Sequence, residues 1–534
     1  TKTDTAFRRI AIGENVEIVE NKALLLKVRD AERITNIIPK SRVITEHTDH
    51  YEVLVHWGLE ESRVLKNLGI KDVPSPILEQ YDWNGLYKPF DHQKTTASFL
   101  TMHRKAFCFN EQGTGKTGSI IWAADYLMKL GLIKRVLVIC PLSIMESAWR
   151  ADLFKFAMHR TVAIAHSYSR EKRIEAIQSD AEYVVVNYDG LEIVADAVKK
   201  EDFDLIVIDE ANAYKTVTTK RWKALKSIIR ADSHVWMMTG TPASQSPVDA
   251  YGLAKLVNPT GVPKFYTSWR DKVMNKVTQF KWMPKIDAQQ KVYDALQPAI
   301  RFTKEECTDL PPVLTETREI PLTPQQKKYY MLLKEKMLIS AAGETITAVN
   351  AAAGVSKLLQ ISAGAAYTDG LEVVEFDCAP RLNVLLEVLE ETSRKVIVFA
   401  PFRHSIDTIN TYLTKHGVTN EVIHGDISLK RRTDVFKRFQ TEDAPRVLVI
   451  QPQAAAHGVT LTAADTIIWY SPVTSVETYL QANARIDRPG QKHPMTVFHI
   501  QGSPIETRLY AMLQGNISNH EQLVDLYKKE LSDA

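Results

Sequence analysis

The sequence predicts an α/β fold with two parallel β-sheet lobes, a helical protrusion between them and a small α+β module at the N-terminus. Short, continuously apolar segments alternate with helical patterns before residue 260 and again after residue 376. Such segments are typical of strands that helices cover on both faces of a parallel sheet. The expected parts are an N-terminal accessory module (1–85), a first lobe (86–260), the helical protrusion (261–375), a second lobe (376–510) and a C-terminal helical tail (511–534).

Length and composition are typical of a globular protein with several domains. The 534 residues are 45% hydrophobic and 25% charged, and the chain is too long for one ordinary core. No apolar run approaches the ~20 residues of a membrane span, and the polar first residues do not resemble a signal peptide. We therefore expect a cytoplasmic protein without a membrane partner. The four dispersed cysteines contain no CxxC pair, which favours buried thiols over structural zinc or a disulfide framework.

The N-terminal module combines strand and helix patterns. Val53, Val55 and Trp57 alternate on one face of an expected strand, and residues 62–68 have helical spacing. Two roles stay open for this module: a structural cap on the main body, or an element that reads DNA.

A glycine-rich loop between an apolar strand and a helical pattern, over residues 106–127, predicts a nucleoside triphosphate site. Gly113 and Gly115 let backbone N–H groups surround a phosphate, and the positive end of the helix dipole faces it. Lys116 is expected to reach the β- and γ-phosphates, and Thr117 to offer a hydroxyl to Mg²⁺. The earlier glycine of the usual P-loop pattern is absent. The predicted ATP-binding residues of the loop are Gln112, Gly113, Thr114, Gly115, Lys116 and Thr117.

Polar residues follow the apolar strands of the first lobe, at the edge of a parallel sheet where ligands collect. Asp209 and Glu210 come directly after the strand 205–208. We expect Asp209 to hold Mg²⁺ and Glu210 to orient the attacking water and remove its proton. Gln93, ahead of the glycine-rich loop, is a candidate reader of the adenine edge because an amide both donates and accepts hydrogen bonds.

The second lobe repeats the strand pattern but has no glycine-rich loop, which suggests that the two lobes share one ATP. Arg485 and Arg488 are three residues apart and therefore lie on one face of a helix. Guanidinium groups facing a γ-phosphate stabilise transition-state charge, as arginine fingers do. Lys430–Arg432 and Lys437–Arg438 could line a nucleic-acid path or belong to a solvated face. The formal net charge of +3 does not by itself indicate nucleic acid.

Several motifs resemble those of superfamily-two helicases. Residues 110–117, 209–212 and 239–242 resemble motifs I, II and III, while residues 456–462 and 481–491 resemble motifs V and VI. The resemblance implies two RecA-like lobes that bind ATP and Mg²⁺.

Further residues are similar to the Swi/Snf branch of that superfamily. Pro141–Ser143 with Trp149 belong to the matching pattern, and the resemblance covers about residues 86–510, most of the chain. Two positions depart from the pattern: Asn212 stands where motif II usually has histidine, and Thr460 where motif V often has asparagine.

The resemblance also implies roles for residues outside the glycine-rich loop. Those expected to couple hydrolysis to movement are Thr239, Gly240 and Thr241. Further contacts with ATP are expected from Gly458 and Gln481. The residues expected to grip nucleic acid are Ser143, Asn187, Tyr188, Phe402, Arg403 and Thr460.

Together these features predict an ATP-driven motor on DNA. We expect it to hydrolyse ATP between its lobes, to move along duplex DNA and to remodel forks or branched DNA. It is expected to act as a monomer in the cytoplasm of a bacterial or phage-infected cell. Two alternatives stay open, and the departures at Asn212 and Thr460 leave room for the second. One is a helicase that separates the strands of DNA or RNA, and the other is an ATP-gated DNA clamp with little turnover.

Overall fold

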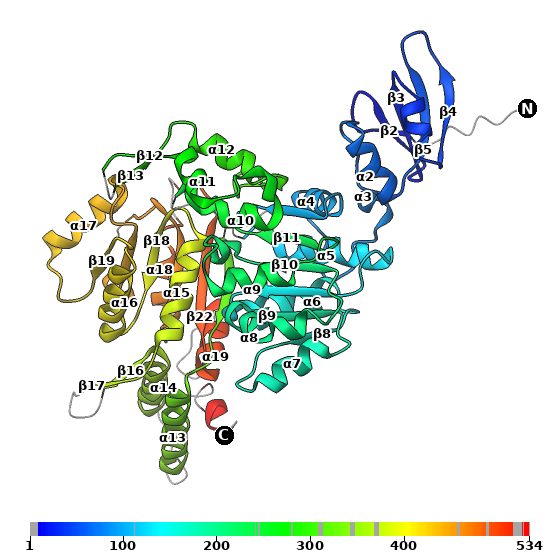
Figure 1. The fold of residues 1–534 in the computed structure, drawn as a ribbon. Helices are drawn as coiled ribbons and strands as arrows, with labels where there is room; N and C mark the ends of the chain where they lie inside the picture. The colour runs from blue at the N-terminus through cyan, green and yellow to red at the C-terminus, as the bar shows by residue number, and fades with distance from the viewer. Residues whose placement is uncertain are drawn as a thin grey trace, which may run out of the picture. The chain divides into compact units, whose positions relative to one another are not determined.

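The computed structural model divides the chain into two compact units (Figure 1). Unit 1 comprises Thr1–Cys140 and Trp149–Phe302, and unit 2 comprises Pro141–Ala148 and Thr303–Ala534. No helix among the described residues is both long and apolar enough to cross a membrane. The described residues are 9–111, 113–240, 242–243, 246–278, 281–307, 313–341, 348–367, 373–455, 460–487, 491–515, 526 and 528–532.

The N-terminal module of unit 1 is a five-stranded antiparallel sheet with short helices, which confirms the predicted α+β module. The hydrogen-bonded order is β1-β2-β3-β5-β4. Val53, Val55 and Trp57 are fully buried, as their alternation predicts, because Val53 and Val55 share the inner face of β5 and Trp57 directly follows this strand. The elements are β1 (Arg9–Ala11), β2 (Val16–Val19), β3 (Ala23–Val28), α1 (Glu32–Thr35), β4 (Ser41–Glu46), β5 (Tyr51–His56), α2 (Leu59–Asn67) and α3 (Ile77–Gln80).

A seven-stranded parallel sheet forms the main body of unit 1. Its order is β14-β6-β11-β10-β7-β9-β8, and every neighbouring pair is parallel. All residues of the central strands β7, β10 and β11 are buried, because their apolar side chains meet helices on both faces. The strands are β6 (Lys105–Cys108), β7 (Val136–Cys140), β8 (Val162–Ile164), β9 (Tyr183–Asn187), β10 (Leu205–Ile208), β11 (His234–Met238) and β14 (Ala299–Ile300).

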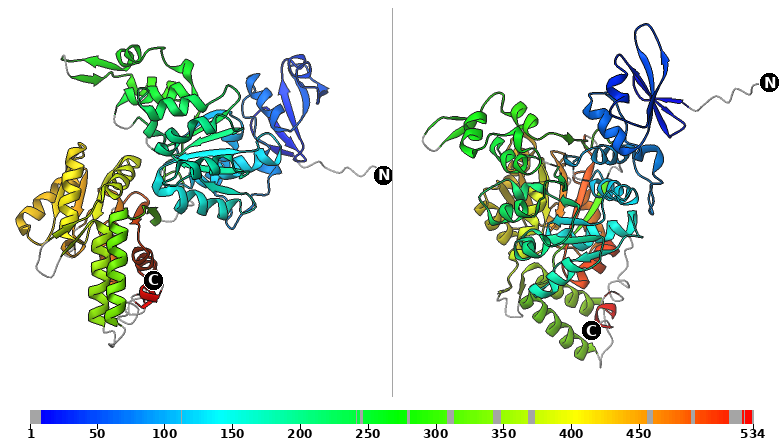
Figure 2. Two further views of the ribbon diagram at one scale, coloured as in Figure 1. Left: turned by 60° about the horizontal axis from the view of Figure 1, so that its bottom comes forward. Right: turned by 45° about the vertical axis from the view of Figure 1, so that its right-hand side comes forward.

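Helices cover both faces of this sheet (Figures 1 and 2). Helices α4 and α5 pack against each other, and α8 packs between α7 and α9. The helices of the main body are α4 (Asp91–Thr101), α5 (Lys116–Lys129), α6 (Ala151–Phe156), α7 (Arg170–Gln178), α8 (Tyr188–Val198), α9 (Lys220–Ile228), α10 (Ala250–Val257), α11 (Tyr266–Val273) and α12 (Ala288–Ala295).

Unit 2 contains a six-stranded parallel sheet in the order β15-β22-β21-β18-β20-β19. Together with the main body of unit 1, it confirms the prediction of two parallel-sheet lobes. Its strands are β15 (Val313–Glu319), β18 (Lys395–Phe399), β19 (Asn420–Ile423), β20 (Val447–Ile450), β21 (Ala464–Trp469) and β22 (Met495–Gln501). Its helices are α13 (Pro324–Ala341), α14 (Ala348–Ala363), α15 (Ala379–Glu391), α16 (Arg403–Lys415), α17 (Leu429–Thr441), α18 (Val476–Asn483) and α19 (Pro504–Gln514).

The segment expected to be a helical protrusion, residues 261–375, is more varied than the sequence pattern indicates. It contains α11 to α14, but it also supplies the edge strand β14 to the sheet of unit 1 and the edge strand β15 to that of unit 2. Two small hairpins complete it. These are β12 (Met274–Lys276) with β13 (Trp282–Pro284), and β16 (Ala365–Tyr367) with β17 (Val373–Glu375).

Candidate nucleotide site

The glycine-rich loop joins β6 to α5, as the sequence predicts. Gly113 and Gly115 have φ values of +79° and +76°. An L side chain rarely adopts this left-handed conformation, so glycine is favoured at both positions. Gly115 is the N-cap of α5, and the first helical residue is Lys116. The backbone N–H groups at this helix start are therefore available to a phosphate. Gln112 lies outside the described residues.

Helix α4 holds the loop from one side. Gln93 donates from Nε2 to the Gly115 carbonyl at 3.0 Å, and its Oε1 accepts from the Phe90 N–H at 2.9 Å. His92 Nε2 lies 2.7 Å from the Thr114 carbonyl oxygen. The amide of Gln93 therefore positions the loop, a role that the sequence pattern did not indicate. It retains one N–H and one lone pair, so recognition of an adenine edge by Gln93 stays a prediction.

Lys116 is a buried cation in this loop. The residue is only 7% exposed, and in the described part of the chain it has no hydrogen bond or ion pair. The charge of Lys116 affects the Cys108 thiol. Burial raises the pKa of this thiol to about 11, and the positive charge of Lys116 opposes that rise. A buried ammonium without a counter-charge is costly. A polyphosphate would supply that counter-charge, so the residues present fit ATP. Thr117 follows in the first turn of α5.

Asp209 is fixed at the end of β10 by two hydrogen bonds. The indole N–H of Trp149 donates to Oδ2, and the Glu210 N–H donates to Oδ1, both at 2.9 Å. The carboxylate is 4% exposed. A carboxylate at this position can hold Mg²⁺ through the water shell of the ion. The contact with Trp149 bridges 60 positions of sequence, and no local pattern indicates it.

Glu210 has an unusual backbone. Its φ and ψ are +50° and +59°, and it caps a 3₁₀ helix, Ala211–Tyr214. A non-glycine residue in this region costs on the order of 1 kcal/mol. The hydroxyl of Tyr188 donates to the carbonyls of Asp209 at 2.6 Å and Glu210 at 3.2 Å, which holds the strained turn in place.

The predicted coupling residues Thr239 and Gly240 follow β11, the strand between β6 and β10. Thr239 is fully buried, and its N–H donates to the Cys108 carbonyl at 3.1 Å. Met238 lies beside Cys108, and Met237 beside Ile208. Three neighbouring parallel strands, β6, β11 and β10, are therefore followed at their carboxyl ends by the glycine-rich loop, Thr239–Gly240 and Asp209–Glu210, as predicted. Thr241 lies outside the described residues.

In unit 2, Arg485 lies in the turn that follows α18, whereas its spacing from Arg488 predicts a position within a helix. Arg485 is 5% exposed, and its carbonyl accepts from the Leu461 N–H at 2.9 Å. This bond joins the segments that resemble motifs V and VI. Gln481 is exposed on α18 and donates to Glu477 Oε1 at 2.9 Å. Gly458 and Arg488 lie outside the described residues.

The predicted nucleic-acid contacts differ in their surroundings. Tyr188 is 7% exposed and donates to the Glu210 turn, so it positions that turn. Ser143 is 2% exposed, groups with unit 2 and donates to Glu387 Oε2 at 3.5 Å. Arg403 is exposed and pairs with Asp426 at 3.0 Å.

The remaining three predicted contacts are at least partly accessible. Asn187 and Phe402 are half-buried, and Thr460 is exposed. The side-chain oxygen of Asn187 is buried without a hydrogen-bond partner. Two residues of the basic stretch on α17 are engaged within the fold: Arg432 donates to three loop carbonyls, and Arg438 pairs with Glu421 at 3.1 Å. The others, Lys430, Arg431 and Lys437, are exposed.

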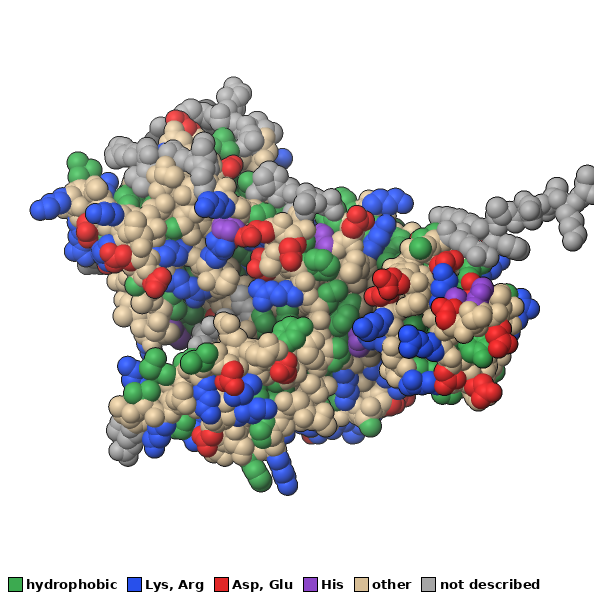
Figure 3. Space-filling model, turned by 90° about the horizontal axis from the view of Figure 1, so that it is seen from above, with side chains coloured by type: hydrophobic (Ala, Val, Ile, Leu, Met, Phe, Trp, Pro, Cys, Tyr) green, Lys and Arg blue, Asp and Glu red, His purple; other side chains and the backbone are tan. Residues whose placement is uncertain are grey.

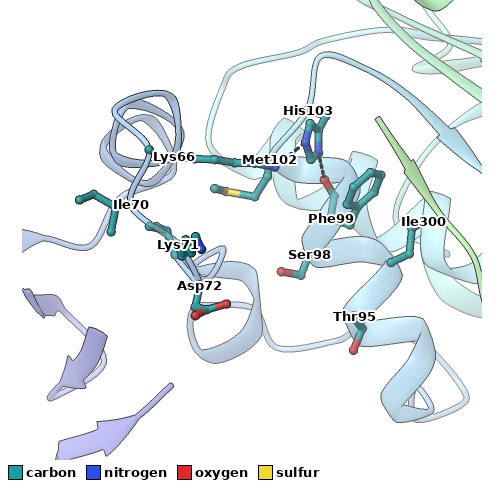
Figure 4. Close-up of a pocket in the computed structure, with 12 residues that line it drawn as sticks. Lys66, Ile70, Lys71, Asp72, Thr95, Ser98, Phe99, Met102, His103 and Ile300 are labelled. Carbon is teal, nitrogen blue, oxygen red and sulfur yellow. Dashed lines mark hydrogen bonds between the residues drawn. The ribbon is translucent and has the colours of Figure 1, made fainter. Parts of the chain in front are cut away.

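A separate hollow of about 740 Å³ lies between α2 and α4 (Figure 4). Lys66 and Lys71 come from the N-terminal module, and Phe99, Met102 and His103 from the main body. Lys66 bonds to His103, whose pKa burial lowers to about 4. None of the predicted ATP-binding residues lines it.

Comparison with known proteins identifies the family. A model of the SNF2-related domain matches residues 92–363, and one of the helicase conserved C-terminal domain matches residues 380–490. A chromodomain-helicase-DNA-binding protein 1-like from Danio rerio is 25% identical over 433 residues, which are 77% of this chain and 41% of that protein. An uncharacterized ATP-dependent helicase of Mycoplasma pneumoniae is 25% identical over 396 residues, 73% of this chain and 37% of that protein. The chain thus spans less than half the length of these relatives.

A solved structure shares the fold. The SWI2/SNF2 ATPase core of Sulfolobus solfataricus in complex with dsDNA matches with a TM-score of 0.63 and 22% identity, over 84% of this chain and 95% of that chain. The SNF2-related model alone matches more than half of the residues. These findings confirm the resemblance drawn from the motifs: the chain belongs to the SNF2-related family of helicase-like ATPases.

Proposed function

We propose that this protein is a DNA-dependent ATPase that moves along duplex DNA and remodels forks or branched DNA. The observation that carries the proposal is the buried cation Lys116, which starts α5 next to a left-handed glycine, two strands from the Asp209–Glu210 pair. This arrangement suits phosphoryl transfer from ATP to water, because positioning and charge stabilisation supply most of that catalysis.

The proposed roles follow from the surroundings of each residue. Lys116 and the backbone N–H groups of the loop would hold the β- and γ-phosphates, while Thr117 and Asp209 would hold Mg²⁺. The bound ion would neutralise charge that develops on the phosphates. Glu210 would orient the attacking water and accept its proton. Arg485 and Arg488, which match motif VI, would stabilise the charge that develops on the γ-phosphate.

DNA as the substrate is supported by the relatives. The matched protein of Danio rerio is named as DNA-binding, and the Sulfolobus solfataricus core was solved with dsDNA. Duplex DNA is therefore our first choice of activator. Remodelling of forks is the finer part of this proposal, and a bacterial or phage host stays a prediction.

Steady-state ATPase assays test the proposal. The protein is assayed without nucleic acid and with single-stranded DNA, duplex DNA, forked DNA and RNA, alongside Lys116→Ala. Lys134→Ala is a charge-matched control, because Lys134 is exposed on the loop after α5. We expect stimulation by duplex or forked DNA that Lys116→Ala abolishes and Lys134→Ala retains. Stimulation only by single strands or RNA would favour a strand-separating helicase, and a flat response would favour an ATP-gated clamp.

Synthetic junctions test the remodelling step. A fluorescent four-way junction or a fork with complementary arms is mixed with protein and ATP, and the products are separated on a gel. We expect ATP-dependent branch migration or reannealing. Duplex-stimulated ATPase without any junction product would restrict the function to translocation.

A further inference from the structure

A candidate metal site lies in the turn between β4 and β5 of the N-terminal module. His47, His50 and Glu52 each offer one ligand atom, and these atoms lie within 4.8 Å of one another. The two imidazole rings stack with 4.4 Å between their centroids. Figure 3 shows histidine side chains gathered on the surface of this module. The nucleotide site uses none of these residues, so their grouping needs another explanation.

The hairpin itself brings the three side chains together. The His47 N–H donates to the His50 carbonyl at 2.9 Å, which closes the turn and places the two histidines opposite each other. Glu52 follows two residues after His50, on the same face of β5. Its carboxylate lies 3.8 Å from His47 Nε2. The ligand atoms therefore come from the turn, through His47 and His50, and from the start of β5, through Glu52.

A carboxylate outside this set orients one of the histidines. Asp49 Oδ1 lies 2.8 Å from His50 Nδ1. A carboxylate in this position accepts the Nδ1–H bond, which leaves the lone pair of Nε2 available to a metal ion. Metal-binding histidines commonly have such a partner on the second ring nitrogen. The contact with Asp49 and the stacking on His47 together fix the orientation of the half-buried His50 ring.

The donor set selects the class of ion. Two imidazoles and one carboxylate suit zinc and its neighbours, whereas Mg²⁺ prefers oxygen ligands. Zinc bonds of about 2.0–2.1 Å place tetrahedral ligand atoms about 3.4 Å apart. The side chains of His47 and Glu52 are 40% and 23% exposed, so they can rotate by the small amount that closure requires. We propose that this hairpin binds one divalent transition metal ion of the zinc class through His47, His50 and Glu52, with water in the open position.

The expectation of no structural zinc rests on cysteine spacing alone, and it does not bear on histidine and carboxylate ligands. The consequence of binding is local. The ion would hold the turn between β4 and β5 against the start of β5. Because β4 is an edge strand of its sheet, this restraint would stabilise a strand that has a backbone partner on one side only.

Titration of the full chain with ZnCl₂ tests the proposal, with any affinity tag removed and metal stripped by a chelator beforehand. Calorimetry is expected to show one saturable equivalent that His47→Ala and His50→Ala each abolish. His56→Ala is the matched control, because His56 is exposed on β5 outside the cluster, and it should bind as the wild type does. Asp49→Ala should weaken binding by about tenfold, as loss of an orienting partner does.

Bound Co²⁺ gives a second readout, because its visible absorption reports tetrahedral nitrogen and oxygen ligands. Circular dichroism in chelator checks that each variant is folded. Asp49→Ala leaves all three ligands in place, so it keeps the test valid if a histidine variant does not fold. Absence of saturable binding, or binding that survives in both His47→Ala and His50→Ala, would overturn the proposal.

Discussion

Replacement of Gly115 by alanine probes how α4 holds the phosphate loop. Gly115 has a φ of +76°, and an added Cβ would lie 2.3 Å from Gln93 Nε2. The left-handed backbone costs an L residue about 1–2 kcal/mol. The amide of Gln93 must also move, which breaks its bonds with Gly115 and Phe90. Each such bond contributes about 0.5–1.5 kcal/mol.

Gly131 supplies the matched control. It follows the same helix, α5, with a φ of +70°, and nothing lies within 4 Å of its added Cβ. Gly131→Ala therefore has the same backbone strain but displaces no side chain. The difference between the two variants contains the contact with Gln93, which the two lost hydrogen bonds set at about 1–3 kcal/mol, and the strain that only Gly115→Ala places in the loop itself.

Binding of a fluorescent ATP analogue measures that difference. A strained loop populates the binding-competent conformation less, and the apparent Kd rises by the reciprocal of that population. A difference of about 1–3 kcal/mol corresponds to about 5- to 150-fold. We expect Gly115→Ala to bind at least about fivefold more weakly than Gly131→Ala. Equal Kd values for the two variants would refute the idea that Gln93 holds the loop.

Three further predictions concern buried polar contacts. Trp149→Phe removes a hydrogen bond to the Asp209 carboxylate. Because a hydrogen bond to a charged group contributes about 1.5–3 kcal/mol, the Mg²⁺ concentration for half-maximal ATPase should rise by about tenfold. Burial lowers the pKa of His499 to about 3 from 6.5, so its contribution to stability is present above pH 6.5 and is lost as pH falls towards 3. Thermal scans should therefore show less acid sensitivity in His499→Gln, by about 2 kcal/mol near pH 5. Arg381→Gln leaves Glu506 buried without its cation, which should destabilise unit 2 by about 3–5 kcal/mol in a melting experiment.

Each of these predictions has a contrary result. For the tryptophan, Trp236→Phe is the control, because its indole donates to the His103 carbonyl at the other end of β11; an equal shift in both variants would show a packing effect. Identical acid sensitivity of wild type and His499→Gln would mean that other groups drive acid unfolding. An unchanged melting temperature in Arg381→Gln would mean that Glu506 finds another partner.

The central strands of both lobes could be predicted from the sequence because their surroundings are uniform. The run at 205–208 is apolar at every position, since both of its faces are covered. Edge strands give no such pattern. β15 reads Val-Leu-Thr-Glu-Thr-Arg-Glu and is half-buried along most of its length, and β14 has only two residues. Each of these two segments is a strand because it forms backbone hydrogen bonds with a neighbouring strand. Its amino-acid composition does not indicate a strand.

The site divides in the same way. Lys116, Asp209 and Glu210 could be predicted because the chemistry of ATP hydrolysis requires those residue types after those strands. The residues that position them could not. Trp149 reaches Asp209 across 60 positions, and His92 reaches Thr114 across 22. Such contacts depend on which helices cover the sheet, and that arrangement is a property of the whole lobe.

The contacts at the two ends of helix α4 affect the choice of a truncation point in the chain. One end of α4 holds the phosphate loop through His92 and Gln93. The other end is held by the N-terminal module: Arg63 donates to the Thr101 carbonyl at 2.7 Å, and the hydroxyls of Ser75 and Thr101 lie 2.7 Å apart. A truncation at residue 86 would remove these restraints and loosen the helix that carries Gln93. Loss of ATPase activity in such a truncation would reflect the displacement of α4. Point substitutions on the outer face of the N-terminal module are therefore the better test of what the module binds.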